Sequence, residues 1–329
     1  MTQMRLKKIS KRKKIKISFL IMLLYITFAY TLYYSFKSTE EVTNEKYINY
    51  LLNNGSALSL YDYKLSKVIN KTLMYILKID ITKPETLFNG SIIGYHDNEE
   101  ESTEDIEKLK KISAYMSDPN DRSVKDPIIY IYNSHQLENY NNNNLEIYGI
   151  TPNVLMASYL LKEKLNDMGL SSIVEDANIT EFLDLNNWDY TNSYRASRIF
   201  MLDKQNTYPT LKYFIDIHRD SVKKSQTTIT INNKTYARIL FVVGLEHNNY
   251  DKNLDLANKL NSMFEKNYPG LSRGVYKKEG YNVNGIYNQD ISPNVMLIEV
   301  GGVDNNIDEV INTLNAISDI LKQYIGDKY

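Results

Sequence analysis

The chain has no cysteine, and only four of its 329 residues are histidine. The absence of cysteine excludes disulfide bonds, thiolate zinc sites and cysteine nucleophiles. A transition metal could therefore be held only by histidine, aspartate and glutamate side chains. The positions of the four histidines decide whether such a site can exist.

Acidic residues are absent from residues 1–16, which contain eight lysines and arginines, and residues 17–36 carry no charge at all. A helix of about twenty uncharged residues can span a bilayer core of about 30 Å. A cleavable signal peptide is the alternative, but its apolar stretch usually has only about 7 to 15 residues and ends in small residues. We expect a basic cytoplasmic tail at 1–16 and a retained transmembrane helix at 17–36, with everything after it outside the cell membrane.

Outside this N-terminal segment, basic residues are fewer than acidic ones. The whole chain has 39 lysines and arginines against 40 aspartates and glutamates. Outside residues 1–36, 31 basic residues face 40 acidic ones, a net charge of −9. Nucleic acids are bound by concentrated basic surfaces, so we expect no nucleic-acid partner.

The segment after the expected span does not have the pattern of a complete domain. Residues 47–78 place apolar side chains at helical intervals, and residues 96–126 are charged and poor in apolar residues. We expect membrane-proximal helices and an acidic linker over 37–126. His96 lies at the edge of that linker, where nothing nearby has ligand spacing.

Residues 127–329 alternate between strand-like and helix-like patterns, as a single α/β domain does. The expected strands are 128–132, 172–174, 213–218 and 295–300, and the expected helices are 154–165, 193–202, 253–267 and 307–321. Residues 227–231 and 236–243 flank Asn232 and Asn233 and are typical of a hairpin. We predict a mainly parallel twisted sheet flanked by helices, with this hairpin as an antiparallel edge.

Two of the histidines, His135 and His218, end apolar strand-like runs, and a third such run carries Glu299. In open α/β sheets, ligands gather at the carboxyl ends of the strands. Imidazole suits zinc, and Glu138, three residues after His135, could be a further ligand. A buried Glu299 beside zinc could accept and return a proton. These residues predict a zinc hydrolase, although strand-end histidines and a buried glutamate can also serve structure alone.

Two further residues, Arg219 and His247, each have more than one interpretation. Arg219 could bind a substrate carboxylate through two parallel hydrogen bonds, or it could form a salt bridge with Asp220. His247 follows the hairpin and is expected to face solvent rather than bind metal.

Several motifs carry a family resemblance, and they occur in unbroken order over residues 127–329. They are Ile131-Tyr-Asn-Ser-His135-Gln-Leu-Glu138, Phe214-Ile-Asp-Ile-His218-Arg-Asp-Ser221, Phe241-Val-Val-Gly244 with Asn249-Tyr250, and Gly285-Ile-Tyr-Asn-Gln-Asp290 leading to Leu297-Ile-Glu299-Val-Gly. Together they resemble the stage II sporulation protein P family. That family is similar in fold to zinc-dependent N-acetylmuramoyl-L-alanine amidases, whose last core strand carries a glutamate before a glycine-containing turn.

The resemblance implies a cell-wall hydrolase that cuts peptidoglycan between N-acetylmuramic acid and L-alanine, with an endopeptidase activity on cross-links also attributed to the family. It implies a role in septal wall thinning and engulfment of the forespore. It also implies two partners, the stage II sporulation proteins D and M. The competing interpretation is a non-catalytic wall-binding scaffold with an amidase-like fold.

The resemblance also bears on the site. In the general amidases a zinc-binding glutamate is the first residue of the first helix. Asn153 and its neighbours occupy that place here. We therefore expect Glu138 to be the third ligand, with Glu175 as the alternative. Our hypothesis is that zinc is held by three ligands, His135, Glu138 and His218. Glu299 would shuttle the proton. The substrate would be oriented by Arg219, Asn288 and Gln289.

Overall fold

The computed structural model describes residues 19–30, 43–56, 115–120, 123–142, 145, 150–281 and 283–326, and it forms two units, Met1–Val42 and Thr43–Tyr329. In the first unit, residues 19–30 form a helix with exposed side chains. No helix among the described residues is long and apolar enough to cross a membrane. The expected tail at 1–16, the remainder of the expected span and His96 lie outside the described residues.

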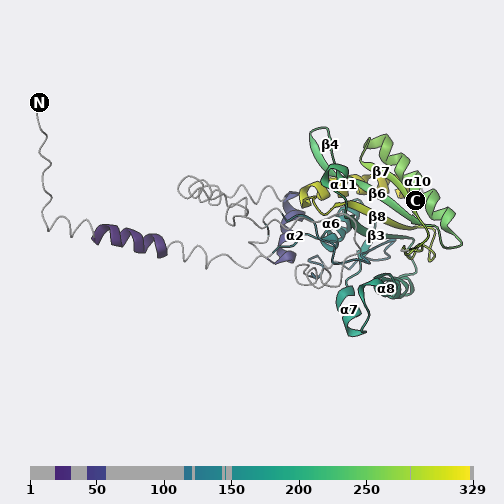
Figure 1. Ribbon diagram of the computed structural model, residues 1–329, viewed down its shortest axis with the longest axis horizontal. Coiled ribbons are helices and arrows are strands. Elements are labelled where there is room, and N and C mark those ends of the chain that lie inside the picture. Colours follow the sequence, from purple (N-terminus) through teal and green to yellow (C-terminus); the bar gives the residue numbers. More distant parts are fainter. Residues whose placement is uncertain are drawn as a thin grey trace, which may run out of the picture. The chain divides into compact units, whose positions relative to one another are not determined.

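The second unit is built on a six-stranded sheet with the order β2-β1-β3-β8-β6-β7. Figure 1 labels β3, β8, β6 and β7 of this sheet. Its strands are β1 (Ile129–Tyr132), β2 (Ser172–Val174), β3 (Tyr213–Asp220), β6 (Ile239–Gly244), β7 (Ser272–Lys278) and β8 (Val295–Gly302). β2, β1, β3 and β8 are parallel, while β6 pairs antiparallel with β8 and parallel with β7. The prediction of a mainly parallel sheet is confirmed, and the carboxyl ends of β1, β3 and β8 meet at one edge.

Helices cover both faces of this sheet. On one face lie α6 (Val154–Asp167), α10 (Tyr250–Asn267) and α11 (Ile307–Gly326), and α11 contacts both of the other two helices. The other face carries α7 (Ile179–Leu185), the short 3-10 helix η3 (Tyr190–Asn192) and α8 (Ser193–Thr207). Met201 of α8 packs with Phe214, whereas Phe264 of α10 packs against Phe241. Strand alternation and register place Phe214 and Phe241 on opposite faces, so the sheet is buried on both sides.

The predicted hairpin exists, but its predicted place at the edge of the main sheet is wrong. After the short helix α9 (Lys224–Thr227), β4 (Thr228–Ile231) and β5 (Lys234–Ala237) form a separate two-stranded sheet, and β5 packs against α11. The chain leaves the hairpin at Arg238, whose backbone N–H donates to Thr227 O at 2.7 Å and whose Nε donates to Gly270 O at 2.9 Å. The first of these bonds continues the register of the hairpin, and after Arg238 the chain changes its pairing partner, so that β6 enters the main sheet between β8 and β7.

Part of the segment expected to precede the domain packs on it. Helix α2 (Asn44–Asn54) is capped by Thr43, contacts α6, and receives a hydrogen bond from Thr151 N at Asn44 Oδ1, 3.0 Å. The buried ammonium of Lys162 on α6 binds Asp118 and donates to Asn120 O at 3.0 Å. The remaining residues of 37–114 lie outside the described ones, and a domain boundary at 127 stays a prediction.

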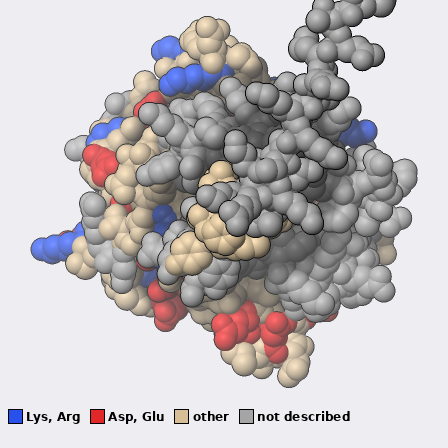
Figure 2. Space-filling view, turned by 90° about the vertical axis from the view of Figure 1, so that its left-hand side faces the viewer, with Lys and Arg blue, Asp and Glu red and all other residues tan. Residues whose placement is uncertain are grey.

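Charged side chains of both signs occur on the face of the molecule drawn in Figure 2. Aspartates and glutamates gather along its lower edge, whereas lysines and arginines are scattered over its upper and left parts. The described part of this face therefore has a mixed charge rather than a continuous surface of one sign.

The end of β6 depends on one close backbone approach, which a stability measurement can test. A Cβ on Gly244 would lie 2.2 Å from the backbone oxygen of Gly285, which cannot turn away as a side chain could. We expect Gly244→Ala to lower the free energy of unfolding by about 1–3 kcal/mol in urea titrations, as overpacking does. Gly326→Ala is the control, since its Cβ would meet nothing closer than 3.9 Å. Equal stabilities of the two variants would contradict the close approach.

Candidate metal centre

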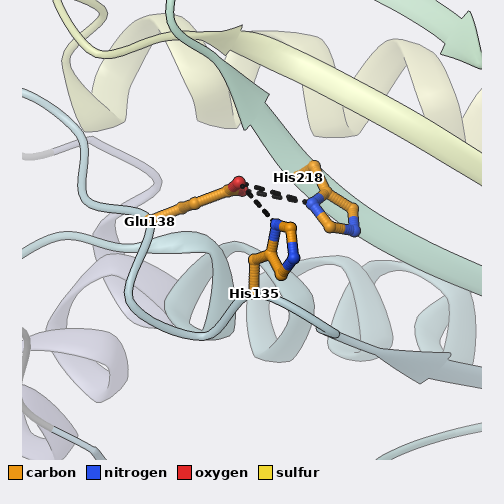
Figure 3. A group of neighbouring side chains, drawn as sticks. All are labelled: His135, Glu138 and His218. Carbon is orange, nitrogen blue, oxygen red and sulfur yellow. Dashed lines mark hydrogen bonds and ion pairs between the residues drawn. The ribbon is translucent and has the colours of Figure 1, made fainter. Parts of the chain in front are cut away.

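Three side chains predicted as ligands converge at the carboxyl edge of the sheet. His135 and Glu138 lie on the turn after β1, and His218 lies near the end of β3 (Figure 3). One potential ligand atom from each residue lies within 4.8 Å of the other two. His218 is 2% exposed, whereas the side chain of His135 is 26% exposed, so the group is closed on the sheet side and open on the turn side.

The two distances from Glu138 to the histidines suit a tetrahedral ion. Oε1 of Glu138 lies 3.4 Å from Nδ1 of His135 and 3.4 Å from Nδ1 of His218, and Figure 3 shows the carboxylate pointing at both rings. Two ligands bonded to zinc at about 2.0–2.2 Å in tetrahedral geometry lie roughly 3.3–3.5 Å apart. Two imidazoles and a carboxylate, with one open side, match the donor set of a hydrolytic zinc site.

Backbone groups of two other elements hold Glu138 in place. Its Oε2 accepts a hydrogen bond from Arg219 N at 2.9 Å, and its carbonyl oxygen accepts one from Val154 N, the first residue of α6, at 3.1 Å. The glutamate is therefore attached to the start of the first long helix although it comes from the preceding turn. Asn153 caps that helix by accepting from Met156 N at 2.9 Å.

Glu175, the competing candidate for the third ligand, does not join the histidines. Its Oε2 accepts from the Tyr130 hydroxyl at 2.6 Å and its Oε1 accepts from Ala177 N at 2.8 Å. Glu175 is thus a buried carboxylate with two protein donors at the end of β2. Among the two candidates, the structure brings only Glu138 to the metal-binding group.

The neighbour of His218 across the sheet is Glu299. The two residues are in register on the parallel strands β3 and β8, so their side chains leave the same face about 4.8 Å apart. Oε2 of Glu299 is buried and has no hydrogen-bond partner among the described residues. Burial, helped by the charges of Glu138 and Asp220, outweighs the opposing effect of His218 and raises the pKa of Glu299 to about 7. A carboxyl group with this pKa exchanges a proton readily near neutral pH.

Two of the ligands, His218 and Glu138, shift each other's pKa. Burial would lower the pKa of His218, but the charges of Asp216 and Glu138 prevail and raise its pKa well above the usual value of 6.5. Burial would raise the pKa of Glu138, but His218 and His135 prevail and lower it well below its usual range. In the metal-free protein His218 therefore carries an extra proton that a metal must displace.

An aromatic wall beside the ligands was not foreseen from the sequence. The ring of His135 lies 5.0 Å from Tyr190 and 5.0 Å from Tyr194, and Tyr194 also stacks on His218 at 6.1 Å. Tyr194 in turn meets Tyr287 edge-on at 5.3 Å. Tyr190 precedes the helix predicted at 193–202, and its four-residue spacing from Tyr194 was the one signal that could have placed both on the same side.

The residues predicted to orient a substrate are largely engaged within the protein. Arg219 donates from Nε to Asn139 O at 3.0 Å, and Asp220 pairs with Arg273 at 2.6 Å rather than with Arg219. Asn288 donates to Tyr194 O and to Ser197 Oγ, both at 3.1 Å.

Gln289 bonds the backbone of β6 at Gly244 N, 2.9 Å, and Val242 O, 2.8 Å. Asn288 and Gln289 thus hold the turn before β8 in place, and these contacts lend no support to a role in substrate binding. His247 lies outside the metal-binding group, half-buried with its ring edge-on to Tyr250 at 6.5 Å.

Comparisons with known proteins point to one family. The family model described as stage II sporulation protein P matches residues 70–322. The curated stage II sporulation protein P of Bacillus subtilis (strain 168) is 34% identical over 248 residues, which cover 70% of this chain and 60% of that protein. The match thus spans about three fifths of the length of that relative.

Zinc binding should compete with protons. Because the pKa of His218 is raised in the metal-free protein, a metal bound at its Nδ1 displaces a proton. We expect the apparent zinc affinity to rise about tenfold per pH unit between pH 6.5 and 7.5, measured by competition with a chromogenic chelator.

His135→Ala and His218→Ala should each abolish stoichiometric zinc binding, whereas His247→Ala should leave it unchanged. Full zinc content in either of the first two variants would contradict the ligand assignment.

The raised pKa of Glu299 should also affect stability. Its folded-state pKa of about 7 exceeds the reference value of 4.5, so the unfolded chain loses this proton first. Ionisation of Glu299 therefore lowers the free energy of unfolding of the metal-free protein as pH rises from 4.5 to 7. We expect Glu299→Gln to raise Tm more at pH 7.5 than at pH 5. Glu279→Gln, at an exposed glutamate, is the control, and the same pH dependence in both variants would refute the assignment.

Proposed function

Because this chain belongs to the stage II sporulation protein P family, we propose that it is a zinc-dependent N-acetylmuramoyl-L-alanine amidase that hydrolyses peptidoglycan during sporulation. The observation that carries the proposal is the convergence of His135, Glu138 and His218 at ligand distances, with Glu299 in register beside His218. A metal-binding group flanked by a carboxyl that titrates near neutral pH is what hydrolysis of an unactivated amide requires.

Each residue of the site has a role in the proposed reaction that follows from its surroundings. Zinc, when bound by His135, Glu138 and His218, would polarise the scissile carbonyl and lower the pKa of a bound water to about 7. Glu299 takes the proton of the attacking water at its unpartnered Oε2 and returns it to the leaving amine nitrogen. The metal-binding group is open on the side of His135, and Tyr190 and Tyr194 line that approach with flat apolar rings.

The substrate we propose is the amide bond between N-acetylmuramic acid and the L-alanine of the stem peptide. Cleavage of peptide cross-links would use the same groups, since both reactions hydrolyse an amide, so an endopeptidase activity is compatible with this site. Bound substrate would approach from the turn side, where His135 is partly exposed, because His218 is buried against the sheet.

The proposed setting follows from the family and from the N-terminal sequence. We propose that the basic tail and residues 17–36 anchor the protein in the membrane as a single span, with residues 37–329 facing the wall at the sporulation septum or engulfing membrane. There it would act beside the stage II sporulation proteins D and M.

Glu299→Gln tests the catalytic proposal. This variant should bind zinc stoichiometrically yet release muropeptides about 10²- to 10⁴-fold more slowly from purified peptidoglycan, because only the proton acceptor is lost. Release by the parent protein should stop with a chelator and return with zinc, and Glu279→Gln should have parental activity. Mass spectrometry of the products separates free stem peptides, the amidase product, from cleaved cross-links. A parent protein that binds wall without releasing any fragment would support a scaffold instead, and full activity of Glu299→Gln would remove Glu299 from the mechanism.

A further inference from the structure

A second carboxylate, Asp216, lies on β3 two residues before His218 and has no assigned role. Strand alternation puts both side chains on the same face, and Asp216 is completely buried. Its Oδ1 lies 3.1 Å from Nε2 of His218, an ion-pair distance although outside hydrogen-bonding geometry. The two ring nitrogens of His218 thus face different carboxylates, Nδ1 towards Glu138 and Nε2 towards Asp216.

A chain of hydrogen bonds fixes Asp216 in this position. Its Oδ1 accepts from Ser134 N at 2.9 Å and its Oδ2 accepts from Ser134 Oγ at 2.6 Å. Ser134 Oγ lies 2.8 Å from Ser197 Oγ, and Asn288 donates to Ser197 Oγ at 3.1 Å. All four residues are buried and come from different parts of the fold, namely β3, the turn after β1, α8 and the turn before β8.

The donors around Asp216 point towards it. A carboxylate only accepts, so the N–H and the single hydroxyl proton of Ser134 both go to Asp216. The hydroxyl of Ser197 has two acceptors, Ser134 Oγ at 2.8 Å and Tyr194 O at 3.2 Å, and it accepts from the amide of Asn288. The carboxylate of Asp216 is therefore surrounded by donors and is an acceptor for a proton on Nε2 of His218.

We propose that Asp216 is the positioning residue of the metal ligand His218, holding the imidazole proton on Nε2 so that the lone pair of Nδ1 faces Glu138 and the metal. A neutral imidazole carries one proton, and an acceptor at one nitrogen fixes which nitrogen remains free to bind metal. The inference rests on the proposed zinc-dependent function.

The same chain of bonds also positions the aromatic wall. Ser197 lies one helical turn after Tyr194 on α8, and the ring of Tyr194 stacks on His218 at 6.1 Å with an interplanar angle of 19°. Asn288 reinforces this arrangement by donating to the carbonyl oxygen of Tyr194. The imidazole of His218 is thus held at its edge by Asp216 and on its face by Tyr194.

Nuclear magnetic resonance of the purified full-length chain loaded with zinc tests the tautomer directly. Long-range proton–nitrogen correlations should show His218 protonated on Nε2 and metal-bound at Nδ1. Asp216→Asn keeps the shape of the side chain and removes its charge, and should weaken zinc binding 10- to 100-fold while shifting the Nε2 proton upfield. A His218 that is protonated on Nδ1 in the parent protein, or an unchanged zinc affinity in Asp216→Asn, would overturn the proposal.

Glu175→Gln is the matched control, since Glu175 is also a buried carboxylate with two protein donors but lies outside the metal-binding group. It should keep the parental zinc affinity. If Asp216→Asn does not fold, Ser134→Ala removes one donor to Asp216, and a several-fold loss of zinc affinity is expected, with no loss counting against the proposal. A parent protein that binds no zinc would refute the proposed function itself, whereas a parent that binds zinc and cleaves wall but has the other tautomer would refute this inference alone.

Discussion

Parallel pairing between β3 and β8 places His218 beside Glu299, and the other groups of the site are arranged around this pair. A slip of one residue would turn one of the two side chains to the opposite face of a sheet that is buried on both sides, so the register is strongly fixed. The pairing shifts just after His218, between His218 and Asp220. At this irregularity the N–H of Arg219 turns away from the ladder and donates to Glu138, so a local break in the sheet positions the third ligand.

The charges around His218 favour a cation. Three carboxylates, Glu138, Asp216 and Glu299, lie around one buried imidazole. The charges of Asp216 and Glu138 overcome the effect of burial and raise the pKa of His218, whereas burial, helped by the charges of Glu138 and Asp220, raises the pKa of Glu299. A divalent cation at the ligand atoms would neutralise these charges, releasing the proton of His218 and drawing the pKa of Glu299 downward. The electrostatic arrangement thus supports a metal site independently of the distances.

Sequence patterns predicted the parts of the site that depend on strand ends, because parallel strands bring their carboxyl ends to one edge whatever else the chain does. His135, His218 and Glu299 belong to this class. Features that depend on how separate elements pack were not predicted: Tyr194 and Ser197 approach the site only because α8 lies over this face. Strand β7 was missed because it is largely polar, and helix α7 was missed because it is only seven residues long. The place of the hairpin was missed because the chain changes its pairing partner at Arg238, which no local sequence pattern indicates.

The ligands differ in how firmly the fold holds them. His218 is on a strand paired on both sides and is buried, whereas His135 and Glu138 lie on a connecting turn. Turns are usually the mobile part of a site, yet this one is tied at Glu138 to β3 through Arg219 N and to α6 through Val154 N. These two hydrogen bonds fix the turn to the edge of the sheet and to the start of α6. Glu138, three residues after His135, therefore lies beside the start of α6 without being part of that helix.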